Sequence, residues 1–93
     1  MPKKVISTQM PDDPVIDSPI ILGKIIKAKR TSTKMKMMDC ASLCGVGINT
    51  LSRIENGNPN SALASVFAVL NGLGIKLNMK DLSSTLNKES EWV

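Results

Sequence analysis

The spacing of apolar and polar residues along the 93-residue chain is mostly helical. Between residues 18 and 74, apolar side chains recur three and four positions apart, which is typical of helices that bury one side. The pattern predicts helices over residues 19–30, 37–44, 48–56 and 62–71. Residues 75–80 instead alternate apolar with polar side chains, as in a half-buried strand. We therefore expect an all-α domain that ends in one short strand.

The first predicted helix has a distinct beginning and end. Ser18 suits the N-cap, and Pro19 suits the first helical position, where the missing proline N–H costs nothing. We expect the helix to end near Arg30, with Lys24, Lys27 and Arg30 pointing outward and complementing the helix dipole. The expected buried stripe consists of Leu22, Ile25 and Ile26, with Ile21 beside it.

The central stretch, DCASLCGVGINTLSRIENG, predicts two short helices joined by a tight turn. We expect Gly45 to end the first of these helices and Gly57 the second. Glycine readily takes the left-handed conformation that is common at helix ends. The expected inward-facing residues are Cys40, Ala41, Leu43, Cys44, Leu51 and Ile54. Asn49, Ser52 and Arg53 share the opposite side of the second helix. This arrangement is typical of a helix-turn-helix, whose second helix reads bases in the DNA major groove.

The outward side chains of the second helix have distinct capacities for base recognition. Asn49 can pair bidentately with adenine, Arg53 can bind guanine or a phosphate, and Ser52 can bond to either kind of base. Ile48 can contact the methyl group of thymine. A merely solvated helix face is the alternative interpretation, and the turn that precedes the helix argues against it.

The residues GVGINTLSRIENG resemble the core signature of the XRE/Cro-type helix-turn-helix family, and the resemblance extends over roughly residues 18–82. It implies a lambda-repressor-like bundle of four to five helices. Family members usually begin the bracing helix with Thr-Gln, whose glutamine binds a phosphate, whereas Lys36 and Met37 occupy those places here. The expected phosphate-binding positions are Lys34, Lys36, Met37, Gly47, Thr50 and Asn56.

Composition and charge agree with an anionic partner. The chain is 42 % hydrophobic with one Phe, one Trp and no Tyr, so its core must be aliphatic and rich in methionine. Its formal net charge is +4, and residues 18–57 hold seven basic side chains against two acidic ones. A basic patch beside a reading helix is the footprint of a DNA-binding protein. Without the motif, a surface charged for solubility would be the better interpretation.

Several other classes of function are excluded or disfavoured. The chain has no histidine, no pair of carboxylates in an apolar setting and no phosphate-binding glycine loop, so we expect neither an enzyme nor a cofactor. Cys40 and Cys44 lie on one helical face, but two thiols alone make a poor zinc site, and we expect free thiols in the core. No apolar run is long enough to cross a membrane and no signal peptide is evident, so we expect a cytoplasmic protein.

The last predicted helix follows the turn Asn58-Pro59-Asn60, with Ser61 as its N-cap. We expect it to end at Gly72 and Gly74, with Leu73 closing the core. Its expected buried residues are Leu63, Val66, Phe67 and Leu70. The strand that follows presents apolar residues at alternate positions, namely Ile75, Leu77 and Met79. A single strand leaves its backbone groups unpaired, so we expect it to pair with its twin in a homodimer.

The predicted organisation has four parts: a flexible N-terminal arm (1–17), a DNA-binding domain (18–74), a dimerisation strand (75–80) and a disordered tail (81–93). The tail is polar and rich in serine, yet it carries the only tryptophan, Trp92. A lone tryptophan in such a tail is either an anchor for a partner's pocket or an exposed aromatic without a role.

The chain also resembles the HipB family of antitoxins, which repress their own operons and bind HipA-type kinase toxins. The resemblance comes from the Ser18-Pro19 opening, the Lys27–Arg30 helix end, the strand Ile75–Met79 and the acidic tail with Trp92. It implies an intersubunit sheet built from the strand. It also implies that Glu91 and Trp92 contact the toxin. The alternative is a stand-alone phage- or plasmid-type repressor, which has no use for the tryptophan.

Overall fold

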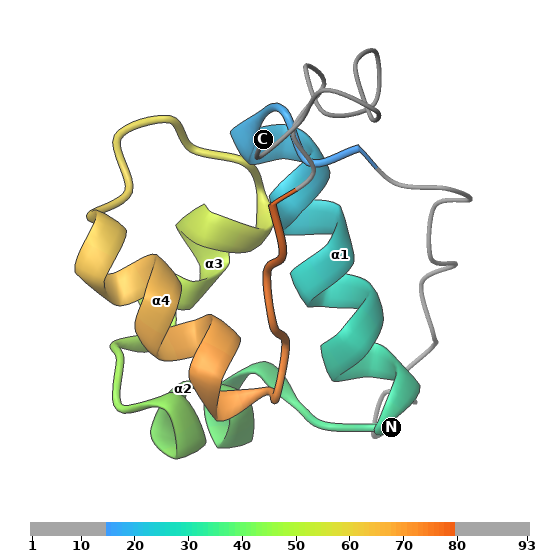
Figure 1. Cartoon of the computed structure of the whole chain (residues 1–93). Coiled ribbons are helices and arrows are strands. Elements are labelled where there is room, and N and C mark those ends of the chain that lie inside the picture. Colours follow the sequence, from blue (N-terminus) through green and yellow to red (C-terminus); the bar gives the residue numbers. More distant parts are fainter. Residues whose placement is uncertain (1–14, 80–93) are drawn as a thin grey trace, which may run out of the picture.

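The computed structural model describes residues 15–79, so the predicted arm up to residue 14 and the tail with Glu91 and Trp92 lie outside the described residues. Four helices form this part of the chain: α1 (Pro19–Ser32), α2 (Met37–Cys44), α3 (Ile48–Glu55) and α4 (Leu63–Gly72). α3 contacts each of the other three helices, and α4 also packs on α2 (Figure 1). The all-α prediction is confirmed, with four helices in the described residues.

The core of the described residues is aliphatic, as the composition predicted, but the prediction that it is rich in methionine is wrong, since Met35 and Met37 only pack partly buried against it. Its completely buried side chains are Ile26, Cys40, Leu51, Val69 and Leu70. Leu73 is also buried and closes the core, as predicted. Each helix contributes to this cluster, so the amphipathic pattern of the sequence is used by all four elements.

The α1 helix begins as predicted but runs two residues further. The Ser18 hydroxyl accepts a hydrogen bond from the Ile21 N–H at 3.3 Å, and Pro19 occupies the first turn. At the other end, the hydroxyl of Thr31 donates to the Lys27 carbonyl at 2.8 Å, and that of Thr33 donates to the Arg30 carbonyl at 2.7 Å. The Lys27 carbonyl lies within the helix, whereas the Arg30 carbonyl belongs to its last turn, so only the Thr33 bond adds a partner at the helix end. The helix thus continues two residues into the segment that was predicted to be non-helical.

Arg30 was predicted to point outward, and this prediction is wrong. The residue is 7 % exposed, and its Nε lies 2.6 Å from Glu55 Oε2 while its Nη2 lies 3.0 Å from Oε1. Its Nη1 also donates to the Met35 carbonyl at 2.8 Å. The guanidinium therefore turns inward because a buried carboxylate on α3 offers a bidentate partner. This ion pair joins the end of α1 to the end of α3.

The two cysteines are free and buried, as predicted. Their Sγ atoms lie 4.0 Å apart, and Cys44 Sγ lies 3.7 Å from the Val69 carbonyl on α4. A Cβ at Gly72 would lie only 2.5 Å from Cys44 Sγ, so glycine permits the close approach of α2 and α4. Burial, together with the neighbouring Cys44, raises the pKa of the Cys40 thiol from 9.0 to about 12. The thiols therefore act as small apolar core residues.

Several predictions of burial are wrong at the surface of the bundle. Leu43 on α2 is 59 % exposed, and on α4 Leu63 is 70 % and Phe67 is 45 % exposed. The inward side of α4 is instead centred on Val69 and Leu70, with Val66 packed beside the core. Because α4 is apolar on most sides, its sequence pattern does not distinguish the side that faces the core.

The beginning of α4 also differs from the prediction. Ala62 rather than Ser61 is the N-cap, and no side chain caps the helix. The Ser61 hydroxyl donates to the Asn58 carbonyl at 3.0 Å, so it stabilises the turn before the helix. The first N–H groups of α4 are consequently left without a side-chain acceptor.

Residues 75–79 follow α4 without helix or strand. The Ile75 N–H donates to the Leu70 carbonyl at 2.8 Å, and the Ile75 side chain packs against the core. Leu77 and Met79 are exposed, by 41 % and 89 % respectively. The predicted strand is therefore not formed within the single chain. A strand forms only beside a partner strand, and the pairing of this segment with a second copy stays a prediction.

Candidate nucleic-acid interface

The turn between α2 and α3 is built on a glycine with a left-handed backbone. Gly45 has φ +73°, and its N–H and that of Val46 donate to the Ser42 and Ala41 carbonyls at 3.2 and 3.0 Å. These bonds close the end of α2, as expected of a left-handed cap. The Val46 side chain packs against the core and fixes the path of the chain into α3. The predicted helix–turn–helix geometry is thus present.

The α3 helix is held closely against α1. Leu51 is completely buried and Ile54 is 4 % exposed, so this side of the helix faces the core as predicted. A Cβ at Gly23 of α1 would lie 2.5 Å from the Ile54 carbonyl oxygen, and one at Gly57 would lie 2.7 Å from Ile20 Cα. Two glycines therefore let the backbones of the two segments touch. Together with the buried ion pair of Glu55, these contacts fix the orientation of α3.

The opposite side of α3 is free to meet a partner. Ile48 is 43 % exposed, Asn49 and Arg53 are exposed, and Ser52 is half-buried. Within the part of the chain that the structure describes, no hydrogen bond or ion pair engages the side chains of Asn49, Ser52 or Arg53. The amide, hydroxyl and guanidinium therefore lie together on one helix, with their hydrogen-bonding capacity available for an external ligand.

The predicted phosphate-binding positions surround the two helices of the motif. Lys34, Lys36, Gly47 and Asn56 are exposed and Thr50 is half-buried. Lys36 and Gly47 are the N-caps of α2 and α3, where backbone N–H groups attract anions. The Met37 side chain packs against the core, so only its backbone N–H remains for an anion at the start of α2.

A polar hollow beside α3 was not predicted from the sequence. It has a volume of about 220 Å³ and lies between α3 and the beginning of α4. Its lining residues are Thr50, Arg53, Asn60, Ser61, Ala62 and Ser65. The hollow is lined by Arg53 and lies at the start of α4, which has no side-chain cap, and both features favour an anion. Sequence reasoning missed it because Ser61 was assigned to capping α4.

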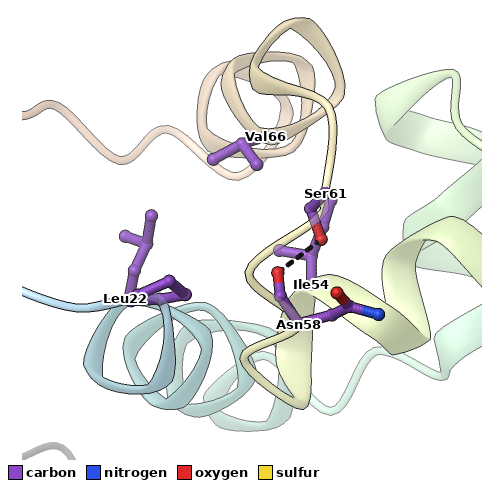
Figure 2. Close-up of a pocket in the computed structure, with 6 residues that line it drawn as sticks. Leu22, Ile54, Asn58, Ser61 and Val66 are labelled. Carbon is purple, nitrogen blue, oxygen red and sulfur yellow. Dashed lines mark hydrogen bonds between the residues drawn. The ribbon is translucent and has the colours of Figure 1, made fainter.

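A second hollow is too small for a ligand. Its volume is about 30 Å³, and it lies where the start of α1 meets α3 and α4. Figure 2 shows Leu22 and Val66 on opposite sides of it, with the Ser61–Asn58 hydrogen bond at its edge. It is a gap in apolar packing of about the size of one water molecule.

A metal site with three or more such ligands and a membrane-spanning helix are both missing from residues 15–79. No three His, Cys, Asp or Glu side chains gather there in a way that could hold a metal ion. None of the described helices is long and apolar enough to span a membrane.

Comparison with known proteins shows which solved structures share this helix-turn-helix fold. No family model matches the sequence, and no curated protein matches it either. The structure is similar to a HipB–O4 20-mer complex and to an O2 20-mer complex of a HipB variant, both with TM-score 0.67 and 27 % identity. These matches cover 72 % of this chain and 94 % and 93 % of the HipB chains. A structure named MDT protein is similar with TM-score 0.66 and 29 % identity, over 72 % of this chain and 94 % of its own. The chain therefore has a helix-turn-helix fold of the XRE/HipB type.

Proposed function

We propose that this chain is a sequence-specific DNA-binding repressor of the HipB type. The observation that carries the proposal is the similarity to HipB in complex with 20-mers, at TM-score 0.67 over 72 % of the chain. It is supported by the exposed polar side of α3, whose Asn49 and Arg53 have no partner within the described residues.

In this mechanism, phosphate contacts position the protein and α3 selects the sequence. The lysines beside α2 and the helix N-termini bind the DNA backbone, and each phosphate contact adds affinity that falls with salt. Asn49 binds adenine, Arg53 binds guanine or a phosphate, and Ile48 contacts a thymine methyl group, while Ser52 adds a hydroxyl contact. Each good base contact contributes about 1–3 kcal/mol of discrimination.

The proposal includes a homodimer formed through residues 75–80. Pairing of the two copies of this segment would satisfy its backbone groups and bring Ile75, Leu77 and Met79 of both copies together. A two-fold dimer places two reading helices about 34–36 Å apart, which matches the half-sites of an inverted repeat. The operator is therefore expected to be an inverted repeat.

Replacing Asn49 and Arg53 with alanine tests the assignment of the reading face. The double variant should keep its fold but lose operator preference, because these side chains are exposed and contribute base contacts. Footprinting on genomic fragments measures this, with Asn71→Ala, an exposed amide on α4, as the matched control. Unchanged footprints of the double variant would refute the site.

The finer role as an antitoxin rests on the tail. We propose that Glu91 and Trp92 bind a HipA-type kinase toxin, since a tryptophan is a common binding anchor. Deletion of residues 81–93 should leave operator binding unchanged and weaken capture of a co-expressed kinase of this type at least tenfold. Equal capture by the truncated and complete proteins would reject the anchor and favour a stand-alone repressor.

A further inference from the structure

Two thiols meet inside the bundle, and the proposed DNA contacts use neither of them. Cys40 and Cys44 lie four positions apart on one face of α2, and their Sγ atoms are 4.0 Å apart. Cys40 is completely buried, and Cys44 is 9 % exposed, so Cys44 is the member of the pair nearer to solvent. The helix therefore holds two soft sulfur ligands side by side.

The distance between the sulfur atoms suits an ion that bridges them. A disulfide requires a separation of about 2.05 Å, so its formation would need the pair to close to roughly half its present distance. A bond from a metal ion to a thiolate sulfur is about 2.3 Å long in zinc sites. Since 4.0 Å is less than the length of two such bonds, an ion beside the line between the sulfurs can bond to both without a change in their separation.

The surroundings of the pair decide which ions can bind. No three His, Cys, Asp or Glu side chains gather in the described part of the chain in a way that could hold a metal ion. Both carboxylate oxygens of Glu55 are bonded to Arg30. The Val69 carbonyl lies 3.7 Å from Cys44 Sγ, but it offers only a hard oxygen. Structural zinc takes four ligands, and calcium and magnesium take oxygen ligands, so the pair favours a soft ion that needs only two sulfurs.

We propose that Cys40 and Cys44 form a binding site for copper(I), a soft monovalent ion that thiolate ligands select. The ion takes the place of both thiol protons, so one Cu⁺ and two thiols give a bis-thiolate complex and two released protons. No electron is transferred in this exchange. The site lies apart from the exposed side of α3, and its test involves no DNA, so it can fail while the proposed function stands.

The protons provide a signature of binding to both sulfurs. Burial, and next the neighbouring Cys44, raises the pKa of the Cys40 thiol to about 12, so this thiol keeps its proton near neutral pH until an ion displaces it. The chain also has six methionines, whose thioethers are soft ligands but carry no proton. Binding by the thiols therefore releases protons, whereas binding by methionines releases none.

Competition of the full chain with bathocuproine disulfonate for Cu⁺, kept reduced by ascorbate without air, tests the site. The wild-type chain should bind one ion and release two protons. Cys40→Ala and Cys44→Ala should each lower the affinity at least about tenfold, because either change leaves a single thiol. Met38→Leu is the matched control, since it removes a thioether that is 68 % exposed on the same helix, and it should leave the affinity unchanged. A smaller loss in either cysteine variant, or the release of fewer than two protons, would overturn the inference.

A second measurement uses the unaltered chain, so it does not depend on variants that fold. Silver(I) serves as the probe, because it has the same charge and softness as copper(I) and needs no reductant. One equivalent of Ag⁺ should leave the helical circular dichroism signal unchanged and shift the amide resonances of Cys40 and Cys44. The resonances of Lys24 and Lys27, which are exposed on α1, should stay in place. A loss of the helical signal would mean that the ion is captured by the unfolded chain, and unmoved cysteine resonances would mean that it binds elsewhere; either result contradicts the site.

Discussion

At the scale of single residues, the Arg30–Glu55 pair is the ion pair that ties α3 to α1 in the described part of the chain. Both side chains are buried, and the guanidinium donates to both carboxylate oxygens at 2.6 and 3.0 Å. The third donation, to the Met35 carbonyl, leaves the pair without a buried unsatisfied atom in this part of the chain. A buried pair that is fully hydrogen-bonded favours one packing of α1 on α3 over alternatives.

Removing one partner of this pair should be costly. Arg30→Ala leaves the Glu55 carboxylate buried without a counter-charge, so the free energy of unfolding should fall by about 3–5 kcal/mol. The double variant Arg30→Met/Glu55→Leu should recover most of this loss, since it buries no charge. Urea unfolding measures both effects, with Lys27→Ala on the exposed side of α1 as a control that changes stability by less than about 0.5 kcal/mol. A loss below about 1 kcal/mol for Arg30→Ala would show that the pair is solvated in solution.

At the scale of the elements, the connection from α1 to α2 contains the one non-glycine residue with positive φ among the described residues. Lys34 has φ 60°, and its N–H donates to the Thr31 carbonyl at 3.0 Å. The left-handed conformation costs an ordinary residue roughly 1–2 kcal/mol relative to the right-handed one. A lysine at such a position is consistent with a functional charge that outweighs the backbone strain.

Two substitutions at Lys34 separate backbone strain from charge. Lys34→Gly and Lys34→Ala both remove the charge, and each should reduce the slope of log K against log salt by about one. Glycine also relieves the positive φ, so Lys34→Gly should be more stable than Lys34→Ala by about 1 kcal/mol. Fluorescence anisotropy at several salt concentrations and thermal unfolding measure the two quantities. An unchanged salt slope in both variants would remove Lys34 from the phosphate-binding set.

The same elements show what could be predicted from the sequence and what could not. The bounds of α2 follow from local signals, since the helical spacing and the left-handed Gly45 are both visible in the sequence. The end of α1 was missed because Thr31 and Thr33 bond back to the helix, although threonine is a weak helix former. Arg30 was misplaced because its partner is 25 residues away and no local pattern indicates the pairing.

The α4 helix illustrates a different limit of sequence reasoning. Its length and its glycine end were predictable, but the period of apolar residues fits more than one face. Leu63 and Phe67 were predicted as core on that pattern and are exposed in the single chain. The apolar pattern therefore indicated the extent of the helix but not which of its sides faces the core.

At the scale of the whole molecule, the described domain presents the polar side of α3 on a rigid base. Asn49 and Arg53 are exposed on this side, and Lys34 and Lys36 are exposed beside α2. The buried core, the Arg30–Glu55 ion pair and the close glycine contacts hold α3 in one orientation. The proposed function requires such an orientation, because a recognition helix must enter the major groove at a defined angle.

The measurement that tests this account most directly is a titration of the full chain against a fragment selected from genomic DNA and against a shuffled fragment of equal length. Between 50 and 200 mM salt, the selected fragment should bind at least about 10³-fold more tightly than the shuffled one. The affinity for both should fall linearly on a log–log salt plot. Equal affinity for all fragments at moderate salt would contradict the claim that the exposed side of α3 reads a DNA sequence.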